Sequence, residues 1–157
     1  MKKLKLLFLF GLLSVMAFSF SACSDDDDEV GSSADLVGVW ELVSYEYWEK
    51  ENGEITYEDA GNENDERIEF KADGTYREAE YYNDEWNWDG EDVGATWNYK
   101  NGVITMRYTE DGETYSSSGT VKELTATKLV VEAYEKETEE GVVYEYWTHS
   151  EYRKISD

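Results

Sequence analysis

The chain has 157 residues and a formal net charge of −23 at pH 7. This length suits one folded domain, and so strong a negative charge argues against nucleic-acid partners, whose phosphates must be neutralised by Lys and Arg. Leu, Ile, Val and Phe make up only about 15% of residues 23–157, a fraction typical of disordered chains, but the same stretch holds all six Trp and all thirteen Tyr. Because large aromatic side chains can replace aliphatic ones in a core, we expect a folded, aromatic-rich β domain with an acidic surface.

The first 22 residues have the layout of a secretory signal peptide. Three lysines within the first five residues precede an apolar run over residues 6–20 and two small residues. The run is too short for a membrane-spanning helix, which needs about 20 residues. We therefore expect cleavage before Cys23 and removal of residues 1–22.

Cys23 is the only cysteine, which excludes a disulfide within the chain. Phe20-Ser21-Ala22-Cys23 resembles a bacterial lipobox, with Phe20 where Leu is usual. The resemblance implies a diacylglyceryl thioether on Cys23 and an acyl group on its amine, so that several acyl chains anchor the protein to a membrane. The alternative is a plain secretory cut that leaves a free thiol.

Five consecutive acidic residues, Asp25–Glu29, follow the candidate anchor. Like charges repel one another and keep such a run extended and solvated. Ser24–Glu29 also resembles the surface-export signal of Bacteroidota-type lipoproteins, which implies an outer-membrane protein that faces the cell exterior; the alternative is the periplasmic face. We therefore expect a lipidated cysteine and flexible tether over residues 23–34 and a domain over residues 35–157.

From residue 35 onward, short runs of alternating apolar and polar residues are separated by glycine turns, and the chain has no proline. This pattern favours β-strands joined by hairpins. The expected strands cover residues 39–48, 54–58, 66–71, 75–82, 95–99, 103–109, 113–121, 128–134 and 142–152. In the last strand, either Tyr144 and Tyr146 or Val143 and Trp147 face inward. Eight or nine strands at a spacing of about ten residues fit an all-β sandwich or a small antiparallel barrel, and closure of a barrel would remove exposed sheet edges.

Five pieces of the domain resemble lipocalin-like proteins in the same order. Leu36–Leu42 resembles their Gly-X-Trp opening, which implies that Gly38 and Trp40 close one end of the barrel. The other pieces are Ile68–Tyr76, Trp97–Ile104, Leu124–Val131 and Tyr152–Ile155. The resemblance covers Asp35 to Ile155 and implies an up-and-down lipocalin-like barrel of about eight strands, preceded by the signal peptide and tether.

The sequence does not indicate a catalytic or metal site. His149 is the only histidine, and no nucleophile is marked beside it. Close carboxylate pairs are expected by chance in so acidic a chain, so they do not point to a glycosidase. Glu85–Asp89 places oxygen ligands like the start of a calcium loop, but Thr96 stands where the bidentate glutamate should be. We expect no enzymatic activity, no cofactor and no metal.

Aromatic residues are the candidate ligand-binding groups. Trp86 and Trp88 stand among Asn, Asp and Glu in the segment 83–92, where rings could stack on sugars; anchoring the loop or filling the core is the alternative. The expected inward lining is Trp97, Tyr99, Met106, Tyr108 and Tyr146, with Trp86 and Trp88 at the mouth. Such a barrel would hold a small apolar or amphipathic ligand or a glycan fragment. The alternative is a filled barrel that acts as a structural or accessory partner of an outer-membrane protein assembly.

Overall fold

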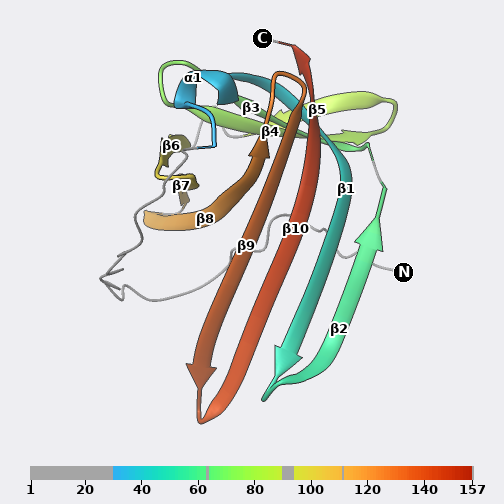
Figure 1. Ribbon diagram of the computed structural model, residues 1–157, viewed down its shortest axis with the longest axis vertical. Helices are drawn as coiled ribbons and strands as arrows, with labels where there is room; N and C mark the ends of the chain where they lie inside the picture. Colours follow the sequence, from blue (N-terminus) through green and yellow to red (C-terminus); the bar gives the residue numbers. More distant parts are fainter. Residues whose placement is uncertain (1–29, 63, 90–93, 111, 157) are drawn as a thin grey trace.

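The computed structural model describes residues 30–62, 64–89, 94–110 and 112–156 (Figure 1). The expected signal peptide, Cys23 and the acidic run therefore lie outside the described residues. One short helix, α1 (Ser33–Leu36), precedes the strands. The strands are β1 (Gly38–Glu51), β2 (Glu54–Gly61), β3 (Glu66–Phe70), β4 (Tyr76–Tyr82), β5 (Glu85–Asp89), β6 (Thr96–Lys100), β7 (Val103–Glu110), β8 (Glu113–Leu124), β9 (Lys128–Glu139) and β10 (Val142–Ser156). All their pairings are antiparallel, which confirms the all-β antiparallel prediction.

The sheet is a ten-stranded half-barrel, which corrects the prediction of a closed barrel with about eight strands. Its hydrogen-bonded order is β5-β4-β3-β1-β10-β9-β8-β7-β6, and β2 pairs with the far part of β1. An isolated bridge between Thr75 and Thr96 joins the start of β4 to β6. The barrel stays open because β5 pairs with the Glu78–Tyr82 part of β4, which leaves only the start of that strand for β6.

A hairpin replaces the loop that the sequence suggested at residues 83–92. Asn83 and Asp84 both adopt positive φ angles, 54° and 65°, and connect β4 to β5 in a two-residue turn. Asn and Asp tolerate this left-handed conformation better than most residues, so the turn forms without glycine. As a result, Trp86 and Trp88 lie on a strand.

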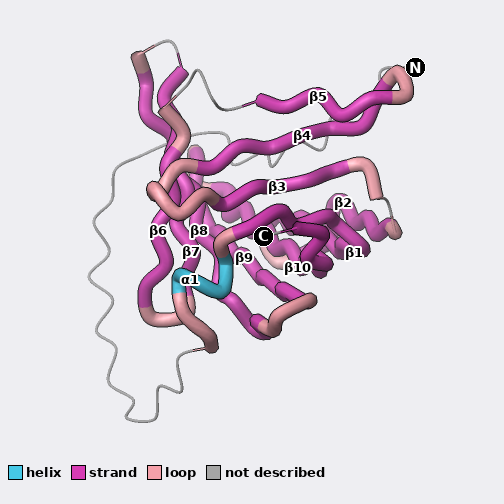
Figure 2. Tube along the Cα trace, turned by 90° about the horizontal axis from the view of Figure 1, so that it is seen from above, coloured by secondary structure: helices cyan, strands magenta, loops and turns pink. Residues whose placement is uncertain are grey.

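Four long strands extend beyond the barrel as a single layer, which we call the blade. It consists of residues 45–61 of β1 and β2 and residues 133–148 of β9 and β10. Figure 1 shows the blade running away from α1, and Figure 2 shows β3, β4 and β5 running across its direction. We call the face of the sheet that carries Trp40 and Tyr152 the inner face, and the opposite one the outer face. A bulge between Leu42 and Ser44 resets the alternation, so that Tyr45 rather than Ser44 continues the inner face.

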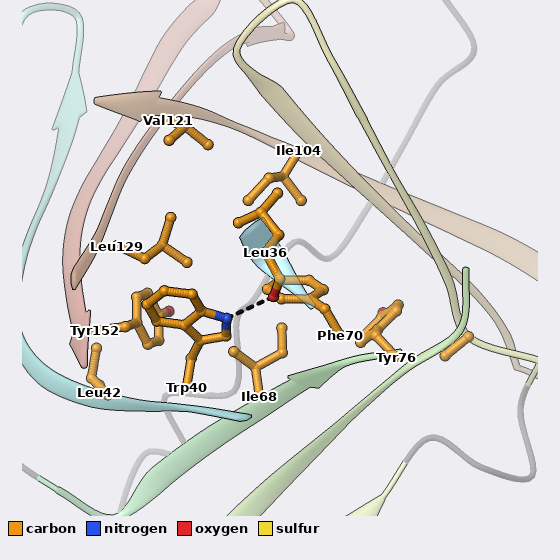
Figure 3. Packing of buried hydrophobic residues seen from close by; sticks show 11 residues of the cluster. Leu36, Trp40, Leu42, Ile68, Phe70, Tyr76, Ile104, Val121, Leu129 and Tyr152 are labelled. Atoms are coloured by element: carbon orange, nitrogen blue, oxygen red, sulfur yellow. Dashed lines mark hydrogen bonds between the residues drawn. The ribbon is translucent and has the colours of Figure 1, made fainter. Parts of the chain in front are cut away.

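The core fills the end of the half-barrel beside α1. Leu36 and Trp40 are fully buried there, and the indole N–H of Trp40 donates to the Leu36 carbonyl at 2.8 Å (Figure 3). Gly38, between them, has a φ of 131°, a region that glycine occupies more readily than other residues. The side chains around the indole come from four strands and include Ile68, Phe70, Ile104, Leu129 and Tyr152. Large rings thus supply much of the packing in a chain that is poor in aliphatic residues.

Candidate ligand-binding face

Four of the predicted lining residues lie together on the inner face of β6 and β7: Trp97, Tyr99, Met106 and Tyr108. All four are half-buried and pack against the apolar core. The Trp97 ring lies 5.0 Å from the Phe70 ring, and its N–H donates to the Lys71 carbonyl at 3.0 Å. The Tyr99 hydroxyl donates to the Val30 carbonyl at 2.5 Å. These side chains therefore help to close the α1 end of the half-barrel.

Tyr146, the fifth predicted lining residue, lies apart from these four on the blade. Tyr146 and Tyr144 both lie on the inner face, so the structure selects the first of the two orientations that the sequence left open. Three tyrosine hydroxyls on this inner face of the blade donate to carboxylates: Tyr45 to Asp59, Tyr47 to Glu49 and Tyr146 to Glu137. Burial and the hydrogen bond to Glu137 raise the pKa of Tyr146 to about 12. This wall of rings and carboxylates continues directly from the core.

Trp86 and Trp88 lie on the outer face, away from the other predicted ligand-binding residues. The register of β4 and β5 places Trp88 opposite Ala79, on the side of the sheet that carries Arg67. The guanidinium carbon of Arg67 lies 3.7 Å from the centre of the Trp86 ring, and that of Arg77 lies 4.2 Å from the Trp88 ring. These cation–π contacts give both indoles a packing role on the outer surface.

Several carboxylates on the outer face are paired with cations. Glu41, only 4% exposed, binds Arg67 at 2.6 Å and Arg153 at 2.5 Å. Burial disfavours its ionised form, but the hydrogen bonds from the two guanidinium groups outweigh burial and lower the pKa of Glu41. The other ion-paired carboxylates between described residues also lie on this face: Glu69, Glu123, Glu132, Glu145 and Glu151. These outer-face charges are thus compensated locally.

Glu78, which the sequence analysis did not single out, is the unusual carboxylate of the inner face. It lies opposite Ile68 on β3 and Asp89 on β5. It forms no hydrogen bond or ion pair with any described residue. Burial, with smaller contributions from the charges of Asp89 and Glu80, raises the pKa of Glu78 to about 7. The absence of a cation beside Glu78 depends on the register between strands, which the sequence alone does not give.

Other candidate chemistry lies on the outer face or is not assembled. The Nδ1 atom of His149 lies 3.1 Å from Glu132, and its ring stacks on Trp147. Glu85, Asn87 and Asp89 share one side of an extended strand, so they do not wrap an ion as a calcium loop does. Among the described residues, no group of three or more His, Cys, Asp or Glu is placed to hold a metal. No helix in the described ranges is both long and apolar enough to cross a membrane.

The fold and this face define an all-β half-barrel that is packed at one end and open along a concave wall, the general plan of a β-barrel binding domain. A family model described as a lipocalin-like domain matches residues 36–131, more than half of the chain, and the chain belongs to this family.

Two solved structures resemble the chain weakly. Both are of Ail, the attachment invasion locus protein of Yersinia pestis, one in complex with the heparin analogue sucrose octasulfate. The identities are 15% and 13% and the TM-scores 0.28 and 0.27, with 76% of this chain and 99% of the other covered in each case. Likenesses this weak carry no argument about this chain. No curated protein matches it.

Proposed function

We propose that the protein is a lipid-anchored lipocalin-like binding protein of the outer membrane, facing the cell exterior, that holds a small amphipathic molecule against its inner face. The anchor would be the acylated Cys23, and the ligand would lie where the packed core opens onto the blade. A ligand of this kind needs an apolar surface joined to polar groups, and lipocalin-like half-barrels offer a concave wall for it. The protein would act by binding, without catalysis or cofactor.

The observation that carries this proposal is the continuity of the inner face. Leu42 and Tyr152 are buried in the core, and the next inner residues along the same strands, Tyr45 and Ser150, lead to the tyrosines of the blade. An apolar group could rest on the core part of this face while a polar group meets the hydroxyl and carboxylate groups that border it. Trp97 and Tyr99 would stabilise this surface, because they pack against the core at the closed end.

The position of the tether supports the anchored arrangement. Val30 is attached to the closed end by the hydroxyl of Tyr99, and Cys23 precedes it by seven residues. Extended at roughly 3.3 Å per residue, this tether would reach about 23 Å. The closed end would then face the membrane, and the blade would project away from it.

Native mass spectrometry of the protein purified from its host tests the binding function. We expect a stoichiometric adduct of a small molecule that is lost on unfolding. A homogeneous unliganded mass, together with an inner face that takes up no added amphiphile, would contradict the proposal. Anchoring is tested separately by replacing Cys23→Ser, which should release the protein from the membrane fraction and remove the mass of the acyl groups. Cleavage by protease added to intact cells tests surface exposure.

A structural role is the second candidate, and one observation favours it. Trp97, Tyr99, Met106 and Tyr108 already fill the closed end of the half-barrel. If the blade served as a docking surface for an outer-membrane partner, crosslinking on whole cells would trap a protein complex, and no small-molecule adduct would accompany the purified chain.

A further inference from the structure

Basic side chains are almost entirely confined to the outer face of the sheet. The register of the strands places Lys50, Arg67, Arg77, Lys100, Arg107, Lys122, Lys128, Lys136, His149 and Arg153 on that face. On the described strands, the only Lys, Arg or His of the inner face is Lys154, which lies at the closed end, 5.5 Å from the Trp40 ring centre. Away from the closed end, the carboxylates of the inner face therefore have no Lys, Arg or His of the described strands on that face to balance their charge.

The inner carboxylates are correspondingly numerous. On β4 and β5 they are Glu78, Glu80, Glu85 and Asp89, and on the blade they include Glu49, Asp59, Glu135 and Glu137. Several of those on the blade accept hydrogen bonds from tyrosines, which satisfies their lone pairs but leaves their charge uncompensated. An anionic ligand would be repelled by this surface, and the described residues assemble no group of acidic ligands for a metal.

The second, independent observation is that Glu78 has no hydrogen-bond or ion-pair partner among the described residues. Its side chain is half-buried on the inner face, between the apolar Ile68 of β3 and the carboxylate of Asp89 on β5. No side-chain oxygen or nitrogen of the described residues is both sealed from solvent and without a partner, so the Glu78 carboxylate remains accessible. It is therefore a partly buried carboxylate that is open to solvent on the inner face.

The polar groups that face Glu78 are carboxylates and phenols. On its own strand and on β5 they are the carboxylates Glu80 and Asp89, with the phenol of Tyr76. From β10 the phenol of Tyr152 faces it, and Tyr152 in turn is close to Glu66 of β3. No ammonium or guanidinium group of a described residue joins this set. Ile68 lies directly opposite Glu78 and belongs to the apolar core.

We propose that the inner face binds an organic cation, with its ammonium group at Glu78 and its apolar part on the Ile68 side of the core. This inference rests on the proposed binding function and specifies its ligand. The carboxylate supplies a charge-assisted hydrogen bond, and the phenols of Tyr76 and Tyr152 lie close enough to Glu78 to sense its charge. A neutral or anionic amphiphile of the same shape brings no cation to that hydrogen bond.

Three water-soluble probes with one phenylalkyl frame test the charge requirement: phenethylammonium, 2-phenylethanol and 3-phenylpropanoate. Binding is measured by calorimetry on the full chain in phosphatidylcholine nanodiscs at 150 mM salt, with empty nanodiscs as the blank. We expect phenethylammonium to bind at least about tenfold more tightly than the alcohol, since a charged hydrogen bond contributes roughly 1.5–3 kcal/mol. Equal or tighter binding of the alcohol or the propanoate would overturn the cation assignment and leave the binding function standing. Failure of all three to bind would count against both.

Two matched variants locate the site. Glu78→Gln should weaken phenethylammonium binding about tenfold, whereas Glu46→Gln, which removes the same charge from an exposed position on the outer face, should change it less than about twofold. Equal effects of the two variants would show that the cation responds only to net charge.

The pH profile of the unmodified protein provides a test that does not depend on a variant folding. The carboxylate fraction of a group with a pKa near 7 rises about tenfold between pH 6 and 8, and the apparent affinity for the cation should rise in proportion. A flat profile would place the cation elsewhere.

Discussion

Replacing Glu78→Gln should stabilise the protein at alkaline pH, although it removes a charged side chain from the interior of the half-barrel. The ordinary pKa of a glutamate is 4.5, and in the folded protein burial and two neighbouring carboxylates raise that of Glu78 to about 7. At 1.36 kcal/mol per pH unit, this difference corresponds to about 3 kcal/mol. The folded state holds the proton more tightly than the unfolded one, so the free energy of unfolding falls as pH rises from about 4.5 to about 7. Glutamine cannot ionise, so the variant does not lose this stability as the pH rises.

Urea denaturation at pH 4.5 and pH 8, without ligand, measures this effect. We expect little difference between Glu78→Gln and the unmodified protein at pH 4.5, and up to about 3 kcal/mol of added stability in the variant at pH 8. Glu46→Gln serves as the control, because it relieves the same amount of general repulsion in a chain of net charge −23. If the two variants gain equally at pH 8, the carboxyl group of Glu78 titrates normally and the reasoning is wrong.

Three further predictions concern the core, the outer face and the net charge. Trp40→Phe should cost about 2–4 kcal/mol in urea denaturation, because it leaves a buried Leu36 carbonyl without its donor and opens a void; a loss below 1 kcal/mol would contradict this role. Glu41→Gln should cost about 2 kcal/mol at pH 7, and the difference should shrink as the pH falls below 4.5, because a lowered pKa stabilises the fold only where the carboxyl is ionised. The melting temperature should rise between 10 mM and 300 mM salt as self-repulsion is screened; equal values would contradict the expectation.

Local alternation and turn chemistry are the features that the sequence predicts well. Asn101-Gly102 adopts the two positive φ angles of a tight hairpin, and the strands on either side bring Trp97, Tyr99, Ile104 and Met106 to one face, as the alternation indicates. These properties depend on neighbouring residues only. For the same reason the all-β class could be read from the pattern.

Long-range pairing decides what the sequence does not show. The hairpin at Asn83 and Asp84 lacks the usual glycine, and its formation puts Trp86 and Trp88 on a strand whose outer face meets two arginines from neighbouring strands. The bulge near Ser44 shifts the alternation of β1, so a face assignment extrapolated from Trp40 fails beyond it. Glu78 is one acidic residue among many until the register reveals that every cation nearby points the other way.

The two faces of the sheet use their aromatic residues differently, and this difference indicates where a ligand belongs. On the outer face, Lys50 lies over Trp48, Trp48 stacks on Trp147, and Trp147 stacks on His149, so the ring surfaces of this column are covered by one another. A sugar or amphiphile would have to displace these contacts to stack there. On the inner face, phenol hydroxyls donate to carboxylates that form no ion pair with a described residue. The more conspicuous tryptophans therefore stabilise the fold, while the face that still lacks a partner for its charge is the one lined by tyrosine and glutamate.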